Sequence, residues 1–342
     1  MVNIASYKLE RKVGFIPRRI TRGLTGWTYR KRHDIIGSTA GAVSDYQIRI
    51  VVHYGSGTDG GEHVYLNGKC RTDFGDIRFT DSDGITELSY WIEEKVDGDY
   101  AIVWVKIPNI PESTVIYIYY GNPNATSKSN PKQTLVIYED MEQQPEGTLY
   151  NDAYYDSANK WVRLTRAVNN INGELDYLTG NIGLNVGEGF RAKFQFWTGG
   201  GSGADAIWLH FYTVSMPTGE QQPCGGYQVA YDEYEDEIQL HFDGTKLKYV
   251  GQTDLDNETW RDAEVRFFNF RTKIYLDGVL KIDYQDSERT LTGNHFGWGA
   301  RTGGLTNEHR IRNLKVWKYI DPEPSHGSWG LEETFFKPYD LY

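Results

Sequence analysis

Apolar and polar residues alternate with a period of two along most of this chain from Trp27 onward, and no long segment follows the 3.6-residue period of a helix. In the segment 190–196, Phe and Ala side chains share one face while Arg, Lys and Gln share the other. The segments 46–53 and 100–107 show the same alternation, and Pro108 ends the second of them. Many such segments, separated by Gly, Pro and Asn, predict an all-β protein built from sandwich or barrel domains.

The chain is long for a single core. It has 342 residues, and beyond about 250–300 residues a hydrophobic core usually gives way to separate domains. The stretch 122–132 is rich in Asn, Pro, Ser and Thr, which is typical of a linker. We therefore predict four parts: an extended basic N-terminal arm (1–26), a small β-sandwich (27–133), a second β-sandwich (134–320) and an aromatic C-terminal tail (321–342).

Basic residues are concentrated at the start of an otherwise acidic chain. Residues 1–32 contain nine Lys or Arg and one acid, a net charge of +8, whereas the whole chain carries −11. A basic segment on an acidic body favours docking to an acidic surface. We predict that residues 1–26, with Arg18, Arg19 and Arg22, contact other subunits or capsid and assembly proteins; nucleic acid is not the expected partner.

Targeting and redox signals are sparse. No stretch approaches the roughly 20 apolar residues that span a bilayer, and the first residues lack the apolar region of a secretory signal. We therefore expect no membrane span, and delivery to a surface by another route, such as within a virion. Cys70 and Cys224 fall in different predicted domains, which excludes a stabilising disulfide framework.

Residues 134–320 carry the most specific pattern. A Gly-rich run (199–203) leads through Ala204-Asp205 into the strand 207–212, and 225–234 is followed by an Asp277-Gly278 hairpin signal and by the closing strands 297–304 and 311–317. This order of segments resembles the concanavalin A-like, or L-type, lectin and glucanase superfamily from end to end. The resemblance implies that the second sandwich is a concanavalin-like jelly roll that binds glycans, from a host or from the environment.

The same resemblance implies a site. Asp205 stands where these lectins have an acceptor for sugar hydroxyls, and Gly226, Tyr227 and Asp236 stand at other carbohydrate-binding positions. The cation-binding strand of the lectins carries Glu-x-Asp; here Asp232 matches the Asp, whereas Ala230 replaces the Glu. Calcium could still bind through oxygens of Asp232, Asp236 and Asp243, because it accepts six to eight oxygen ligands in varied geometry. The alternative is a plain acidic strand and turn, without any cofactor.

An enzyme is the rival interpretation. Glucanases of this fold place acids at i, i+2 and i+4 on one strand, about 5–5.5 Å apart for retention, and Glu233, Glu235 and Glu237 have that spacing. However, the family pattern has Asp in the middle and apolar residues between, whereas Tyr234 and Asp236 intervene here. The run 232–237 is therefore predicted to be a solvated charged edge. We expect no catalytic residues, with a β-glucanase-type glycoside hydrolase as the third-ranked function.

The first sandwich resembles a β-rich module of unknown function that occurs in prokaryotic and viral surface proteins, often before a lectin-like domain. The matching segments include 27–31, 75–79, 90–93, 104–108 and 118–123. Together the two resemblances imply a surface-exposed structural or adhesion protein. We predict a virion component (capsid-decorating, spike or tail) with a carbohydrate-binding domain, located on the virion surface or outside the cell; the alternative is a secreted or cell-surface adhesin of a prokaryote.

Overall fold

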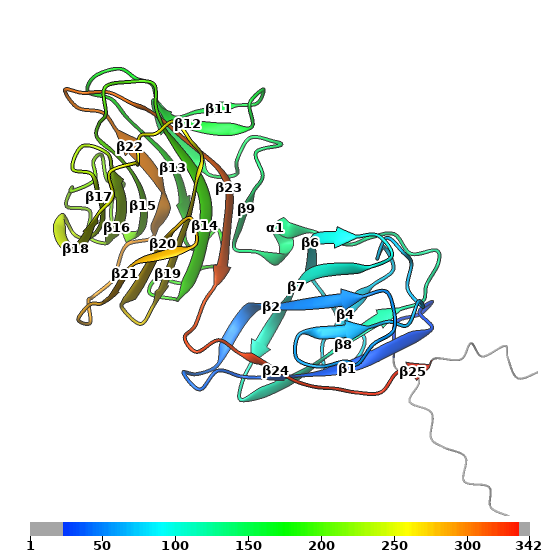
Figure 1. Cartoon of the computed structure of the whole chain (residues 1–342). Helices are drawn as coiled ribbons and strands as arrows, with labels where there is room; N and C mark the ends of the chain where they lie inside the picture. Colours follow the sequence, from blue (N-terminus) through cyan, green and yellow to red (C-terminus); the bar gives the residue numbers. More distant parts are fainter. Residues whose placement is uncertain (1–22, 335–342) are drawn as a thin grey trace, which may run out of the picture.

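The computed structural model describes residues 23–334 and shows two β-sandwich domains side by side (Figure 1), which confirms the predicted all-β fold. Arg18, Arg19 and Arg22, and most of the predicted arm, lie outside the described residues. A helix, α1 (Pro131–Thr134), stands at the junction of the domains. Asn130 caps it by accepting a hydrogen bond from the Gln133 N–H, and Pro131 occupies its first turn, where a missing N–H costs nothing.

The first domain consists of a six-stranded and a four-stranded sheet. Its strands are β1 (Tyr29–Ile36), β2 (Val43–His53), β3 (His63–Tyr65), β4 (Arg78–Thr80), β5 (Glu87–Leu88), β6 (Tyr90–Val96), β7 (Tyr100–Ile110), β8 (Ser113–Tyr120), β24 (Ser325–Trp329) and β25 (Glu333–Thr334). One sheet has the order β24-β1-β8-β4-β5, with β25 also on β1, and the other β3-β2-β7-β6. Alternate residues of β2 and β7, such as Ile48, Ile50, Val103 and Val105, are buried between the sheets, as the period-two pattern requires.

The chain returns to the first domain after completing the second, so the described part of the predicted tail is not a tail. In Figure 1, β24 and β25 run along β1 at the edge of the first domain. His33 Nε2 lies 2.9 Å from His326 Nδ1, and the Trp329 ring stacks on His33 with 3.7 Å between centroids. Backbone pairing and these rings hold the segment in place, because β1 offers an unpaired edge that would otherwise be exposed.

The second domain packs a seven-stranded sheet against an eight-stranded one. The seven-stranded sheet has the order β10-β13-β22-β15-β16-β17-β18, and the other β11-β12-β23-β14-β19-β20-β21, with β9 also on β23. Their bounds are β9 (Ile137–Glu139), β10 (Thr148–Asn151), β11 (Tyr154–Asp156), β12 (Trp161–Thr165), β13 (Asn172–Leu178), β14 (Phe190–Gly199), β15 (Ala206–Thr213), β16 (Tyr227–Asp232), β17 (Glu237–Phe242), β18 (Thr245–Gly251), β19 (Arg261–Phe268), β20 (Arg271–Leu276), β21 (Val279–Gln285), β22 (His295–Arg301) and β23 (Glu308–Lys318).

Aromatic rings fill the space between these two sheets. Phe190 on β14 contacts Phe211, Phe267 and Phe296 from both sheets, with ring centroids 4.9 to 5.9 Å apart. Such pairs contribute about 0.5–1.5 kcal/mol each beyond the burial of their area. The predicted Asp277-Gly278 hairpin joins β20 and β21, and both residues have positive φ, 48° and 77°.

The two domains are joined by a buried polar bridge and an aromatic contact. Gln47 of β2 donates to the Thr134 carbonyl at 2.9 Å and accepts from the Lys318 N–H at 3.0 Å. Beside it, the rings of Trp104 and Trp317 lie 5.5 Å apart. The junction therefore combines directional hydrogen bonds with apolar packing.

Cys70 and Cys224 are free and buried in separate domains, as the sequence predicts. Within residues 23–334, no helix has the length and apolar character needed to cross a membrane.

Candidate functional site

Several loops converge at one end of the seven-stranded sheet. Asp205 immediately precedes β15, Asp232 ends β16 and Arg301 ends β22; the register places Ala206 opposite both Asp232 and Arg301. The three side chains therefore border one cavity, of about 610 Å³. Its lining is Asp205, Glu220, Gln221, Asp232, Tyr234, Glu235, Arg301, Gly303, Gly304 and Leu305.

Asp205 is held by Arg301. Its Oδ2 accepts from the Arg301 Nε at 2.9 Å, and the Arg301 Nη2 lies at the same distance from this oxygen. The Ala204–Asp205 peptide bond is cis. A Cβ at Gly303 would come within 2.8 Å of Asp205 Oδ2, so a larger residue there would displace the carboxylate. This close approach fixes the position of Asp205 at the cavity wall.

The Gly-rich run 199–203 allows two loops to pack closely together at this site. The Ser202 and Gly203 N–H groups both donate to the Thr306 carbonyl, at 2.6 and 3.2 Å. A Cβ at Gly201 would meet that same carbonyl at 1.9 Å, which only glycine avoids. The run thus brings the loop before Asp205 against the loop after Arg301.

Acidic side chains crowd the floor of the cavity. Asp232 is 2% exposed, and its Oδ1 accepts from the Glu235 N–H at 2.8 Å. Burial, and then the neighbouring carboxylates of Glu220, Glu235 and Glu233, raise the pKa of Asp232 to about 7. Burial also raises the pKa of Glu220, while the nearby Arg301 opposes that rise.

Arg301 carries the positive charge of the site. Burial works against its charge, but the carboxylates of Glu220 and Asp205 raise its pKa above the ordinary value. The Glu220 Oε2 lies 3.9 Å from the Arg301 Nε and has no hydrogen-bond partner among the described residues. The arrangement offers a ligand one guanidinium and several acceptor oxygens within one cavity.

The structure separates the predicted sugar-binding residues. Asp205 and Asp236 lie at the same end of the sheet, whereas Gly226 and Tyr227 lie at the other end of β16. Tyr227 and Asp232, at the two ends of β16, are five residues and thus about 16 Å apart. Tyr227 is also fully buried, and its hydroxyl donates to Asp286 Oδ2 at 2.9 Å. Gly226 and Tyr227 therefore do not share a site with Asp205.

The predicted calcium ligands are not brought together either. Asp236 precedes β17 and Asp243 follows it, so a whole strand separates their backbones. Asp243 Oδ1 accepts from the Gly225 N–H at 2.8 Å, at the end of the sheet remote from Asp232. Within residues 23–334 no group of three or more His, Cys, Asp or Glu is arranged to hold a metal ion. The proposed set of three therefore does not fit a single calcium ion.

The acidic run 232–237 is solvated only in part: Tyr234, Glu235 and Asp236 are exposed as predicted, whereas Asp232 and Glu233 are buried. The Glu233 carboxylate is fully buried; its Oε2 lies 3.0 Å from His309 Nε2, whereas its Oε1 has no hydrogen-bond partner among residues 23–334. Glu235 and Glu237 instead pair with Lys246. Glu233 and Glu235 lie in the turn between β16 and β17, so the three acids do not line one strand as a glucanase requires.

Sequence reasoning missed Arg301 and Glu220, which complete the site. Neither residue stands near Asp205 in the sequence, and only the pairing of β15 with β22 brings Arg301 beside it. The Gly303-Gly304 pair at the end of the predicted strand 297–304 is the available signal, because adjacent glycines mark a loop that approaches other backbone closely.

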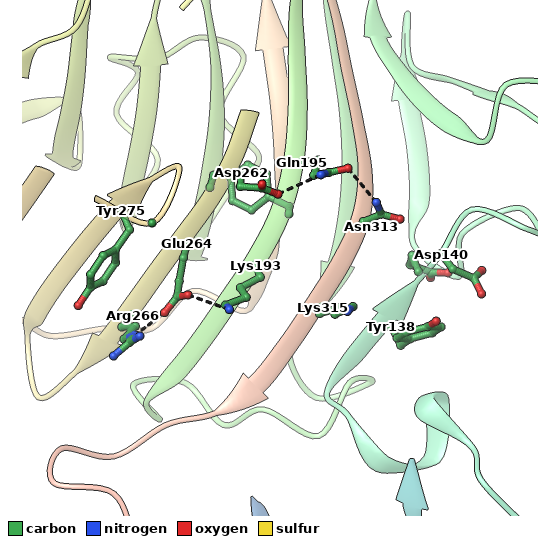
Figure 2. Close-up of a pocket in the computed structure, with 14 residues that line it drawn as sticks. Tyr138, Asp140, Lys193, Gln195, Asp262, Glu264, Arg266, Tyr275, Asn313 and Lys315 are labelled. Atoms are coloured by element: carbon green, nitrogen blue, oxygen red, sulfur yellow. Dashed lines mark hydrogen bonds and ion pairs between the residues drawn. The ribbon is translucent and has the colours of Figure 1, made fainter. Parts of the chain in front are cut away.

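A second hollow, of about 660 Å³, lies on the outer face of the eight-stranded sheet (Figure 2). Gln195 donates to Asp262 at 3.0 Å and accepts from Asn313 at 2.8 Å across its floor. Glu264 bonds Arg266 and lies 3.3 Å from Lys193. The floor thus holds two separate groups of paired side chains, on the strands β23, β14 and β19.

Comparison with solved structures finds similar chains, each of which covers about half of this one. They include the exoplasmic/lumenal domain of VIP36 bound to Ca²⁺ and Man3GlcNAc, with 20% identity, a TM-score of 0.44 and coverage of 53% of this chain and 87% of that one. The carbohydrate recognition domain of Emp47p shows 15% identity and a TM-score of 0.43, covering 54% and 95%. The potassium-bound carbohydrate recognition domain of Emp46p shows 11% identity and a TM-score of 0.44, covering 54% of this chain and 98% of that one.

No curated protein gives a significant sequence match. Residues 73–161 match a family model described as a domain of unknown function (DUF2341). The matched segment begins before β4 and reaches the first residue of β12, so it includes parts of both domains and the connection through α1. This agrees with the resemblance of the first sandwich to a module of unknown function.

Proposed function

We propose that this protein binds carbohydrate in the cavity between Asp205 and Arg301. The observation that carries the proposal is the convergence of acceptor carboxylates and one guanidinium in a cavity of about 610 Å³. Ligand sites of this size typically combine a few fixed polar groups with apolar surface. Here the apolar surface comes from Tyr234 and Leu305, which are 66% and 41% exposed.

Each side chain has a defined role in this proposal. Arg301 bonds only one oxygen of Asp205, so Oδ1 remains for a ligand hydroxyl. Glu220 also lines the cavity, and its Oε2 is buried without a hydrogen-bond partner among residues 23–334. A sugar hydroxyl would donate to Asp205 Oδ1, while the Tyr234 ring would pack against the apolar face of the sugar.

The site does not need a bound cation to balance its acids. Arg301 already supplies a positive charge 2.9 Å from Asp205. The protonated form of Asp232, which its raised pKa favours below about pH 7, removes a second negative charge. We therefore propose binding without resident calcium, although VIP36 and Emp46p were crystallised with cations.

The test is a broad glycan array followed by titration of any hit with the wild type, Asp205→Asn and Asp243→Asn. Loss of one hydrogen bond to a charged acceptor costs about 1.5–3 kcal/mol, so Asp205→Asn should weaken binding at least about tenfold. Asp243→Asn is the matched control, because this carboxylate lies at the far end of β17. Absence of any hit for the wild type, or equal loss in both variants, would refute the proposal.

We further propose that the protein is displayed on a surface, first as a virion component and alternatively as a secreted or cell-surface adhesin of a prokaryote. The basic segment 1–26 and the resemblance of the first sandwich to modules of surface proteins support this. Mass spectrometry of purified virions and of proteins released from intact cells by protease distinguishes the two settings. Detection only in the cell interior would contradict both.

A further inference from the structure

A second surface of the second domain gathers arginine and tryptophan. It lies on the outer face of the eight-stranded sheet and adjoins the hollow lined by Gln195, because Arg312 donates to Gln195. We call it the Arg–Trp surface; its six residues are Trp161, Arg163, Trp197, Trp260, Arg310 and Arg312. All six are partly exposed, and they come from β12, β14, β23 and the residue before β19.

Strand register places three of these side chains and Tyr154 in a row across the strands. Tyr154 of β11 is opposite Arg163, Arg163 is opposite Arg310, and Arg310 is opposite Trp197. Neighbouring strands lie about 4.8 Å apart, so the row crosses four strands over about 14 Å. An extended ligand lying across the strands would contact every member of the row.

The row places two cations directly opposite each other. Like charges at such cross-strand positions destabilise a sheet. Arg310 pairs with Glu308 at 2.7 Å, but Arg163 and Arg312 have no acidic partner within ion-pair distance among residues 23–334. The Arg163 Nε is also buried without a hydrogen-bond partner. Within residues 23–334 of a chain whose net charge is −11, this surface thus holds two arginines that are not paired with acids.

Aromatic rings hold the guanidinium groups in position. Arg310 lies 3.9 Å from the Trp197 ring centroid and 4.6 Å from that of Trp161. Arg312 lies 3.9 Å from the Trp260 centroid, and its Nε donates to Gln195 Oε1 at 2.9 Å. Stacking fixes the plane of a guanidinium and leaves its edge free, which suits two-pronged recognition of carboxylate or sulfate.

We propose that the Arg–Trp surface binds an acidic polysaccharide through carboxylate or sulfate groups of its sugars. Arg163 and Arg312 would take the anionic groups, and the partly exposed indoles would pack on the sugar rings. The chain would continue past Gln195 into the hollow of Figure 2, which Tyr138 and Tyr275 border. This site is separate from the Asp205 cavity at the end of the other sheet and does not depend on the function proposed for it.

A polyanion such as single-stranded nucleic acid fits this surface less well. Nucleic-acid grooves track the phosphate backbone with a continuous line of cations. Here Asp262 and Glu264 line the hollow into which the ligand would continue, and they would repel closely spaced phosphates. An acidic sugar chain, with neutral groups between its charges, matches three arginines interleaved with aromatic rings.

The experiment measures binding of oligogalacturonate and of a heparin oligosaccharide to the full chain, with a neutral laminarin oligosaccharide and oligodeoxythymidine as comparisons. We expect either or both acidic sugars to bind, with an affinity that falls as salt rises, and no binding of the neutral sugar. The double variant Arg163→Gln/Arg312→Gln should lose at least about tenfold in affinity. Arg271→Gln is the matched control, because Arg271 lies on the same sheet but is paired with Asp283 at 2.7 Å.

A separate readout keeps binding apart from folding. Because Arg163 faces Arg310, Arg163→Gln should leave Tm unchanged or raise it while weakening the acidic sugar. Asp205→Asn should not affect this binding, so failure of the Asp205 site and failure of the Arg–Trp surface are distinguishable. Equal binding of acidic and neutral sugars, tighter binding of oligodeoxythymidine, or full affinity in the double variant would overturn the inference.

Discussion

Asp232 makes the stability of the second domain depend on pH in an unusual direction. Its pKa is raised from 3.8 to about 7 by burial and by neighbouring carboxylates. Between these two pH values the unfolded chain ionises at this position while the folded chain keeps the proton. Folding therefore gains from Asp232 below about pH 4, and that gain is lost as pH rises toward 7.

The magnitude follows from the two pKa values. One pKa unit corresponds to about 1.36 kcal/mol. The difference between 3.8 and about 7 thus corresponds to a loss on the order of 4 kcal/mol between pH 4 and pH 8. A typical domain is stabilised by roughly 5–15 kcal/mol, so this loss is a large part of the total. Because Asp232 is 2% exposed, solvent screening reduces this change in the free energy of unfolding only slightly.

The assay is urea unfolding of the wild type and of Asp232→Asn at several pH values from 4 to 8. Asparagine cannot ionise, so the variant should gain stability relative to the wild type as pH rises. The lost bond from Gln239 Nε2, which is 3.2 Å from Asp232 Oδ2, adds an offset that does not depend on pH. Only the slope of the difference is therefore read. A difference that stays constant across this range would refute the reasoning.

Three further outcomes are expected. Chelation with EDTA should leave glycan binding unchanged, because Arg301 balances the acids of the cavity; loss of binding that calcium restores would contradict this. Glu233→Leu removes the hydrogen-bond partner of the buried His309 Nε2 and should lower the free energy of unfolding by about 1–3 kcal/mol. Reducing ends released from β-glucan by the wild type and not by Glu233→Gln would instead show an enzyme. Gln47→Ala should lower the free energy of unfolding by about 1–3 kcal/mol, because the buried Thr134 carbonyl and Lys318 N–H both lose a hydrogen-bond partner. An unchanged midpoint in urea would show that these hydrogen bonds are dispensable.

The strands could be predicted because their signal is local. In β14 every second residue from Phe190 to Phe196 is buried, as the alternation in the sequence indicates. The Asp277-Gly278 turn is also local, since two residues with positive φ specify the hairpin by themselves. Both features depend only on residues that are neighbours in the sequence.

The site could be predicted only in part, because it depends on pairing between distant strands. The sequence predicts Asp205 as a sugar acceptor and Asp232 as a calcium ligand, and the register of β15 with β16 places the two beside one cavity. Tyr227 was wrongly placed beside them, since the sequence does not show that β16 carries it to the opposite end of the sheet. Burial of Glu233 was also missed, because its partner His309 is 76 residues away.

The return of the chain to the first domain is a consequence of the edge that β1 presents. β1 pairs with β8 on one side, and its other side would leave a row of unpaired N–H and C=O groups. β24 and β25 cover that side, and Arg30 of β1 pairs with Glu333 at 2.6 Å. Residues from both sides of the second domain therefore complete the first one. A boundary drawn at residue 133 describes the order of the sequence, but the first domain as a folded unit includes residues 325–334, and the second domain is an insertion between its strands.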